Sequence, residues 1–197
     1  MRRINNTTKN IKESIDLLET MSNIVNVRHF ESRSIPIKTL NLLFEAFSLG
    51  PSLANQQPWE IIEIEQEEVR KIVKATLDPF LTVGTTGGQS WLSSSPHVYL
   101  IINDLRRAEA RIGQVGQVFS TQDTFAALQN LRIYAQIEGV GTSVVREFDT
   151  DLLKKELKIP DAYSPVAILA MGYSIDEPEI PPRFTFHEIL HKGGVED

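Results

Sequence analysis

The sequence predicts a single domain, residues 1–197, that contains both helices and strands. Its hydrophobic content of 41% over 197 residues is enough to bury a sizeable core. Segments with apolar residues every three or four positions, which is the period of a helix, are interspersed with short β-branched runs that are typical of strands. The composition shows no bias toward disorder, collagen-like repetition or a coiled coil.

Five segments have the apolar spacing of helices. Gly50 stops the second of them, and Asp149 or Thr150 caps the last. Residues 121–138 carry apolar side chains around most of the helical cylinder, so we expect a central, buried helix that ends at Gly139. The predicted helices cover residues 11–21, 37–49, 66–74, 121–138 and 149–157.

Four segments have the pattern of strands. The first alternates glutamate with isoleucine, as a half-buried strand would, and the others are short and mostly apolar. The predicted strands cover residues 60–65, 97–103, 141–145 and 166–173, and the stretch from 77 to 95, rich in Gly, Thr and Ser, is expected to be irregular.

The end of the chain is expected to leave the body of the domain. Residues 176–182 are rich in proline and acidic residues, which favours an extended arm. The apolar side chains that follow, Phe184, Phe186, Ile189 and Leu190, are poorly suited to water. We therefore expect residues 176–197 to pack across a partner subunit, whereas residues 1–9 are expected to be flexible.

Composition also excludes several classes of function. The absence of cysteine rules out a disulfide framework, thiolate metal sites and a catalytic thiol, and it suits the cytoplasm. A formal net charge of -6 argues against a nucleic-acid partner. The first ten residues lack the apolar stretch of a secretory signal, and no run approaches the length needed to cross a membrane.

The sharpest local motif is the run Pro-Ser-Leu-Ala-Asn-Gln-Gln-Pro-Trp at residues 51–59, between a predicted helix and a predicted strand. Its two prolines restrict the backbone. The side chains of Ser52, Asn55 and Gln57 can donate and accept hydrogen bonds toward a heteroaromatic ring or a ribityl chain. The alternative is an ordinary turn in which Asn55 bonds its own backbone.

This motif resembles the flavin-contacting loop of the nitroreductase family. Other parts of the chain resemble that family in the same order, and the likeness extends over nearly the whole chain from about residue 10. The matching parts are the end of an arginine-rich motif at Arg28-His29-Phe30, a strand at 91–101, a long central helix at 123–142, a last core strand at 165–173 and a C-terminal tail at 183–191.

The resemblance implies an α+β fold in which helices flank a mainly antiparallel sheet. It also implies a homodimer with exchanged C-terminal tails and two FMN molecules in clefts built from both chains. The family mechanism is ping-pong: NADH or NADPH reduces the flavin and leaves, and a small acceptor such as a nitroaromatic or a quinone takes its place. No catalytic side chain is expected, because flavin N5 carries the hydride.

The resemblance also assigns individual residues to the flavin. Arg28 is expected beside the pyrimidine side of the ring, unless it forms a surface ion pair with Glu31 or Glu45. Arg183 is expected to reach the FMN phosphate. Gln89, at the end of the Gly-rich loop 84–89, is a candidate for the pyrimidine edge. The expected cofactor-binding residues are Asn26, Arg28, Pro51, Ser52, Leu53, Asn55, Gln89, Val145, Arg146 and Arg183.

The chain departs from the family pattern in three places. Residues 24–26 are Ile, Val and Asn where the family has two arginines and a serine, and Pro181 replaces a common tail cation. Residues 145–147, Val-Arg-Glu, stand where many members present a backbone patch to flavin N5. Either Arg146 compensates for a lost cation or its loop shapes an unusual pocket. A flavin-binding protein without efficient turnover is therefore an alternative function.

A rival motif lies in the tail. The run His187-Glu188-Ile189-Leu190-His191 has the His-Glu-x-x-His spacing of zinc metalloproteases, which needs both histidines on one helical face. The only candidates for a third ligand downstream are Glu196 and Asp197. We rank a tail helix that packs on a partner above a metal site, and we expect no metal.

Overall fold

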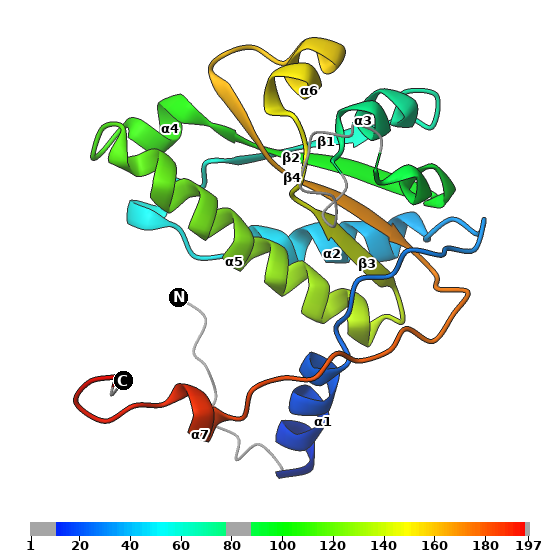
Figure 1. Cartoon of the computed structure of the whole chain (residues 1–197), viewed down its shortest axis with the longest axis vertical. Coiled ribbons are helices and arrows are strands. Elements are labelled where there is room, and N and C mark those ends of the chain that lie inside the picture. Colours follow the sequence, from blue (N-terminus) through cyan, green and yellow to red (C-terminus); the bar gives the residue numbers. More distant parts are fainter. Residues whose placement is uncertain (1–10, 78–87, 196–197) are drawn as a thin grey trace.

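The computed structural model describes residues 11–77 and 88–195. Residues 1–9, which we expected to be flexible, lie outside the described residues, and so do residues 84–87 of the Gly-rich loop. The elements shown in Figure 1 are α1 (Ile11–Ser22), α2 (Ile37–Ser48), η1 (Leu53–Asn55), β1 (Trp59–Ile64), α3 (Val69–Ala75), η2 (Ser90–Ser94), β2 (His97–Asp104), α4 (Leu105–Glu109), α5 (Val115–Ile137), β3 (Gly141–Val145), α6 (Thr150–Leu157), β4 (Tyr163–Gly172) and α7 (Phe186–Ile189).

The four strands form one antiparallel sheet in the order β1-β2-β4-β3. Tyr99 of β2 lies opposite Leu169 of β4, which in turn lies opposite Val144 of β3. The two central strands are buried on both faces, and for this reason their sequences are continuously apolar rather than alternating. The mainly antiparallel sheet expected from the resemblance is confirmed.

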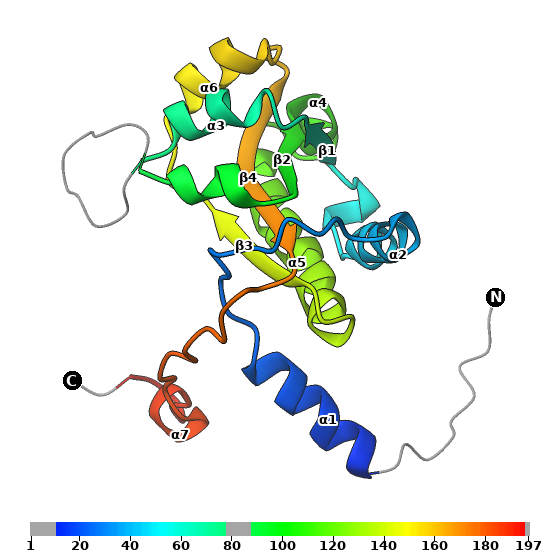
Figure 2. The ribbon, with the colours of Figure 1, turned by 90° about the vertical axis from the view of Figure 1, so that its right-hand side faces the viewer.

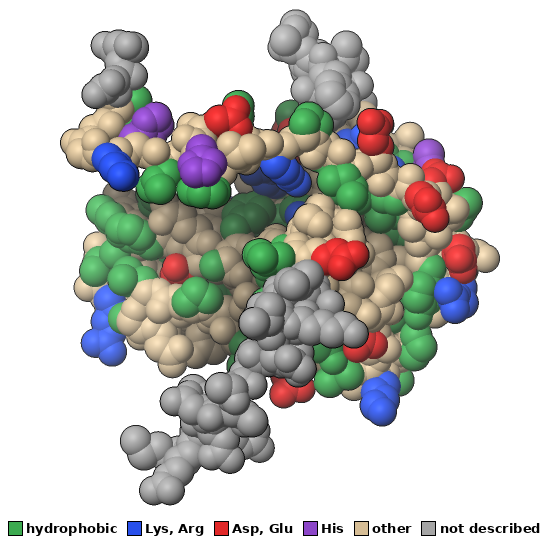
Figure 3. Space-filling model, turned by 90° about the horizontal axis from the view of Figure 1, so that it is seen from below, with side chains coloured by type: hydrophobic (Ala, Val, Ile, Leu, Met, Phe, Trp, Pro, Cys, Tyr) green, Lys and Arg blue, Asp and Glu red, His purple; other side chains and the backbone are tan. Residues whose placement is uncertain are grey.

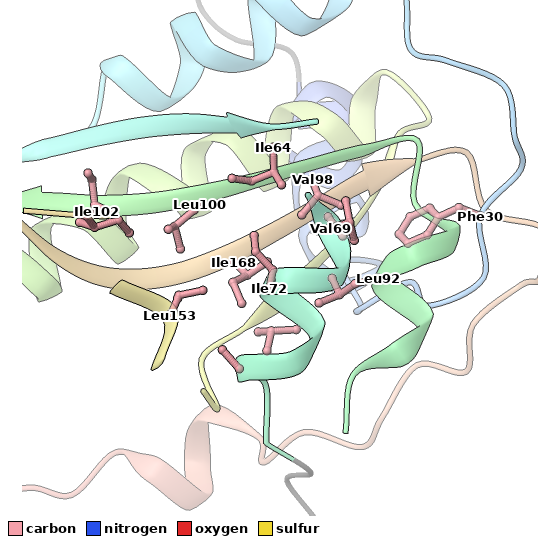
Figure 4. Packing of buried hydrophobic residues seen from close by; sticks show 14 of the residues in the cluster. Phe30, Ile64, Val69, Ile72, Leu92, Val98, Leu100, Ile102, Leu153 and Ile168 are labelled. Atoms are coloured by element: carbon pink, nitrogen blue, oxygen red, sulfur yellow. The ribbon is translucent and has the colours of Figure 1, made fainter. Parts of the chain in front are cut away.

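Helices cover both faces of the sheet. In Figures 1 and 2, α2 and α5 lie on one face, and α3, α6 and η2 lie on the other. Each interface buries a separate apolar cluster, so the sheet is the middle of three layers. The α2–α5 side includes Leu43, Phe47, Leu128, Leu131 and Leu169, and the opposite side, drawn in Figure 4, includes Ile72, Leu92, Leu100, Leu153 and Ile168.

Several boundaries differ from the prediction for local reasons. The central helix begins at Val115 rather than at residue 121; its first turns contain Gly116, a weak helix former, and expose Val115, Val118 and Phe119, so they fall outside the buried pattern that defined the prediction. Residues 66–68 form a turn, so α3 begins only at Val69. The strand predicted over residues 97–103 begins at His97 as expected and ends at Asp104, whereas the family likeness at residues 91–101 also spans the 3-10 helix η2 and Pro96. The short helix α4 was not predicted.

Two caps explain where short helices start. The carboxylate of Asp149 accepts a hydrogen bond from the backbone N–H of Leu152 at 2.9 Å and begins α6, as expected. In the same way, Asp104 accepts from the backbone N–H of Arg106 at 2.9 Å and begins α4. A cap of this kind contributes about 1 kcal/mol to the stability of the helix.

Helix α1 and the C-terminal tail project from the same end of the body (Figures 1 and 2). Every residue from 175 to 195 is exposed, with Phe184 at 78% and Leu190 at 63% of full exposure. The start of the tail is tied to the body, because the backbone N–H of Ile175 donates to the carbonyl of His29 at 3.1 Å. Packing of this tail on a second subunit remains a prediction. Among the described helices, none has the length and apolar character needed to span a membrane.

Candidate functional site

The segment from residue 24 to residue 30 lies along the open end of the sheet. Asn26 forms a parallel bridge with Thr142 of β3, and the backbone N–H of Val27 donates to the carbonyl of Thr142 at 3.0 Å. Phe30 forms an antiparallel bridge with Ser174, just beyond β4. This pairing fixes the backbone of residues 26–30 beside the edge strand β3.

Two adjoining pockets lie where this segment, β3 and the side of α5 meet. Both are lined by Asn26, Val144 and Arg146. The first, of about 260 Å³, adds Phe125, Leu128, Gln129 and Arg132. The second, of about 160 Å³, adds Arg28, Gln89, Trp91, Ser143, Val145 and Glu147. The structure thus brings together five predicted residues from distant parts of the sequence, namely Asn26, Arg28, Gln89, Val145 and Arg146.

Arginine side chains line both pockets, and one acid, Glu147, lines the second pocket and accepts from the backbone N–H of Arg146 at 3.2 Å. Neither Arg28 nor Arg146 has a carboxylate within ion-pair distance among residues 17–77 and 88–195, whose side chains the structure describes. Glu31 instead accepts from Arg33 at 3.2 Å, so the surface ion pair considered for Arg28 is not formed with it. The guanidinium of Arg146 stands over the ring of Phe125, 5.9 Å from the ring centroid. Seen from below, basic side chains gather in the hollow between the tail and the body (Figure 3).

Gln89 is buried and its carboxamide has partners within the protein. The indole N–H of Trp91 donates to Oε1 of Gln89 at 2.7 Å, and Nε2 of Gln89 donates to the carbonyl of Leu77 at 3.2 Å. The side chain therefore fixes the indole in the wall of the pocket. A hydrogen bond from Gln89 to a flavin remains a prediction.

The loop of residues 51–57 does not line either pocket. It lies against the start of the central helix, where the backbone N–H of Leu53 donates to the carboxylate of Asp123 at 2.9 Å. The side chain of Asn55 accepts from Gln57 at 2.9 Å, rather than bonding its own backbone as in the alternative of an ordinary turn. Pro51, Leu53 and Asn55 are exposed, and Ser52 is half-buried.

The backbone of this loop is strained. Ala54, Asn55 and Gln57 adopt left-handed φ values of 49°, 56° and 46°. Such conformations cost about 1 kcal/mol or more for residues other than glycine, and they persist where the surroundings impose them. Here the Ser52 hydroxyl accepts from the backbone N–H of Gln57 at 2.9 Å. The loop is thus held in one shape by hydrogen bonds within it and by its bond to Asp123.

Sequence reasoning missed Arg132, a residue of α5 that lines the first pocket. The available signal was a single cation among the buried positions Leu128, Leu131 and Ala135 of the same helix. Arg183 of the tail lines neither pocket, yet it lies close enough to affect Arg132. Burial lowers the pKa of Arg132, and the positive charge of Arg183 lowers it further.

The His-Glu-x-x-His segment does not have the geometry of a zinc helix. Helix α7 ends at Ile189, and Leu190 has an extended backbone, so His187 and His191 do not share a helical face. The carboxylate of Glu188 accepts from both the N–H and the hydroxyl of Thr185 as part of a capping box, which lowers its pKa. The described residues contain no group of three potential metal ligands.

A comparison with known proteins identifies the fold and the lineage. The sequence profile of the Nitroreductase family matches residues 26–173, most of the chain, including the segments that line both pockets. The chain belongs to the nitroreductase family. Membership of this family confirms the resemblance that the motifs at residues 28–30 and 51–59 indicated.

Individual members of the family are distant in sequence but similar in shape. A protein of Archaeoglobus fulgidus, provisionally named NADH dehydrogenase/NAD(P)H nitroreductase, is 24% identical over 77% of this chain and 82% of its own. The NADPH:FMN oxidoreductase of Vibrio harveyi, solved with NAD+, superposes with a TM-score of 0.78 at 16% identity, over 92% of this chain and 79% of its own. An FMN-dependent nitroreductase of Clostridium difficile gives a TM-score of 0.73 at 18% identity, over 90% and 99%.

Proposed function

We propose that this nitroreductase-family protein is an FMN-dependent oxidoreductase that passes hydride from NADH or NADPH to a small acceptor such as a nitroaromatic or a quinone. The observation that carries the proposal is the pair of joined pockets beside β3, which hold arginines without a described carboxylate partner. FMN is a planar ring with a phosphate at one end, and it needs both a flat slot and a cation. Bound there, it supplies the hydride chemistry at N5.

The residues present fit the two ends of such a cofactor. Trp91, Val144 and Val145 form part of the wall of the second pocket, and we propose that the flavin ring lies against them. Arg28 stands beside that wall, where a fixed cation would stabilise the negative charge of the reduced ring. Arg146 lines both pockets and can neutralise charge in either one. The pockets open to solvent on one side, which leaves room for the nicotinamide and the acceptor to bind in turn.

The strained loop at residues 51–57 is best explained by a second subunit. This exposed loop does not line the pockets of its own chain, so we propose that it completes the flavin cleft of a partner. The outer faces of α2 and α5 support a homodimer, since Leu49 is 76% exposed and Ile137 59% exposed beside a shallow apolar hollow. The apolar tail would then lie across the partner rather than in water.

Purified protein tests the redox function directly. We expect a yellow protein with flavin absorbance near one FMN per chain, bleached anaerobically by NADH or NADPH and restored by a quinone. A colourless protein that takes up no added FMN would refute the proposal. Flavin that binds but is not bleached by either nucleotide would favour the alternative of a flavin-binding protein without turnover, which the missing arginines at residues 24 and 25 motivate.

The dimer can be tested in the same preparation. Ile137→Glu places a charge on the exposed apolar face of α5 and should convert the dimer to a monomer in analytical ultracentrifugation. Because the partner's loop would be lost, the monomer should also bind FMN at least tenfold more weakly. Lys155→Glu, on an exposed position of α6 in the opposite layer, is the matched control and should change neither property. A monomeric Ile137→Glu variant with full FMN affinity would contradict a shared cleft.

A further inference from the structure

Arg132 is the most enclosed of the cations in the first pocket, and its side chain is held by neutral acceptors. Its Nε donates to the hydroxyl of Thr142 at 3.2 Å. Its Nη2 donates to the carbonyl of Val25 at 3.3 Å and to the side-chain oxygen of Asn26 at 3.1 Å. The guanidinium therefore lies directly beneath the backbone of residues 25 and 26 and is oriented by three hydrogen bonds.

The positive charge of Arg132 has no counterion in this arrangement, and a second positive charge lies nearby. Among residues 17–77 and 88–195, whose side chains the structure describes, no carboxylate lies within ion-pair distance of Arg132 and no group accepts a hydrogen bond from its Nη1. The nearby charge is that of Arg183, which has the same sign and lowers the pKa of Arg132 in addition to the effect of burial. Burying a cation without a counterion is unfavourable, and a second cation beside it increases the cost.

An anion between the two guanidinium groups would remove both penalties. A phosphate monoester carries a charge of about -1.5 to -2 at neutral pH and offers several strong acceptor oxygens. Guanidinium groups bind such oxygens with charge-assisted, often bidentate hydrogen bonds. The pocket that contains Arg132 adjoins the pocket lined by Trp91, and the two share Asn26, Val144 and Arg146. With the ring beside Trp91, the phosphate end of the flavin would lie toward α5.

The position of Arg132 also explains how the site could function without cations at residues 24 and 25. Ile24 and Val25 have no charge to offer a phosphate, yet the Arg132 guanidinium reaches the carbonyl of Val25 from a helix 107 positions away. We propose that Arg132 supplies the phosphate-binding charge of this site in place of cations at residues 24 and 25, and that it acts together with Arg183. This inference rests on the proposed flavin function and names the residue that selects FMN over flavins without a phosphate.

The test compares two ligands that differ only in the phosphate. FMN and riboflavin are titrated against the flavin-free dimer by fluorescence quenching, with ultracentrifugation confirming the assembly. The wild type should bind FMN more tightly than riboflavin. In Arg132→Met, FMN affinity should fall at least tenfold, while riboflavin affinity changes by less than about twofold. Added salt should weaken FMN binding more in the wild type than in this variant.

Three further variants separate charge from structure. Arg132→Gln keeps N–H donors for the neutral acceptors but removes the charge, so it should lose the preference for FMN as fully as Arg132→Met. Arg132→Lys keeps the charge and should retain most of the preference. Arg183→Ala should reduce it without affecting the dimer. The matched control is Arg111→Met, an exposed arginine of the loop before α5, which should leave both affinities unchanged.

The possible failures are distinguishable. A wild type that binds neither flavin refutes the proposed function, and this inference falls with it. A wild type that binds both flavins equally leaves the flavin function standing but overturns the phosphate assignment. Equal losses of FMN and riboflavin in Arg132→Gln would show that the side chain only shapes the pocket, and would overturn the inference as well. If Arg132→Met fails to fold, Arg132→Gln and Arg183→Ala decide the matter by the same comparison.

Discussion

Replacement of Gly50 by alanine should weaken the packing of α2 against α5. A Cβ atom at residue 50 would lie 2.4 Å from the Cβ and 2.5 Å from the Cα of Ala127, in the middle of the central helix. Carbon atoms in contact are separated by about 3.5–4.0 Å, so the two helices would have to separate by about 1 Å. Leu43 and Phe47 of α2 are almost completely buried at this interface and would be displaced with it. We expect the free energy of unfolding to fall by about 2–3 kcal/mol.

The free energy of unfolding is measured by urea denaturation, monitored by circular dichroism at one protein concentration for all variants. Gly139→Ala is the matched control, because Gly139 has a φ of +69° and nothing within 4 Å of the added atom. It should cost only the backbone strain, about 1–2 kcal/mol. Ala127→Gly combined with Gly50→Ala should recover part of the loss, since the Cα of residue 127 still obstructs. An unchanged urea midpoint for Gly50→Ala alone would refute the close packing.

Two further outcomes follow from single side chains. Nε2 of His97 accepts from the backbone N–H of Ile35 at 3.0 Å, and burial lowers the pKa of this histidine. The neutral imidazole therefore stabilises the folded state fully above about pH 6.5, the ordinary pKa of histidine. This stabilisation decreases as the pH falls from about 6.5 to the lower pKa of the folded state. His97→Gln should therefore flatten the dependence of the unfolding free energy on pH between about 7 and 5, and parallel curves for the two proteins would contradict this. Asp149→Ala removes the bond to the backbone N–H of Leu152 and should cost about 1 kcal/mol in thermal or urea unfolding, whereas Asp151→Ala keeps that cap and should cost less; equal losses would speak against capping.

The elements that the sequence could predict are those with local signals. The apolar spacing of Leu40, Leu43 and Phe47 marks the buried face of α2 without reference to the rest of the fold. The Asp149 cap is likewise contained within a few residues. By contrast, the first turns of α5 contain Gly116 and expose Val115, Val118 and Phe119, so they lie outside the buried apolar pattern of residues 121–138. Their packing against α4 is visible only in the structure.

The site was predicted less completely than the fold because its parts meet only in three dimensions. Resemblance supplied Asn26, Arg28 and Arg146, which do line the joined pockets. It gave no reason to single out Arg132, since the importance of that residue comes from its reach to the carbonyl of Val25, not from its own neighbours in sequence. A lone cation in a buried helix was the signal that remained in the sequence.

The pairing of the 24–30 segment with the far end of the chain has a consequence for biosynthesis. His29 contacts Asp176 from 147 positions away, and Asn26 meets Arg132 from 106 positions away. Contacts that close such long loops form late in folding, because bringing the two ends together costs chain entropy before the contact can stabilise the structure. A chain still emerging from the ribosome therefore lacks one wall of the pocket. On the proposed function, FMN would be acquired after release of the finished chain, and its binding would stabilise the contacts that form last.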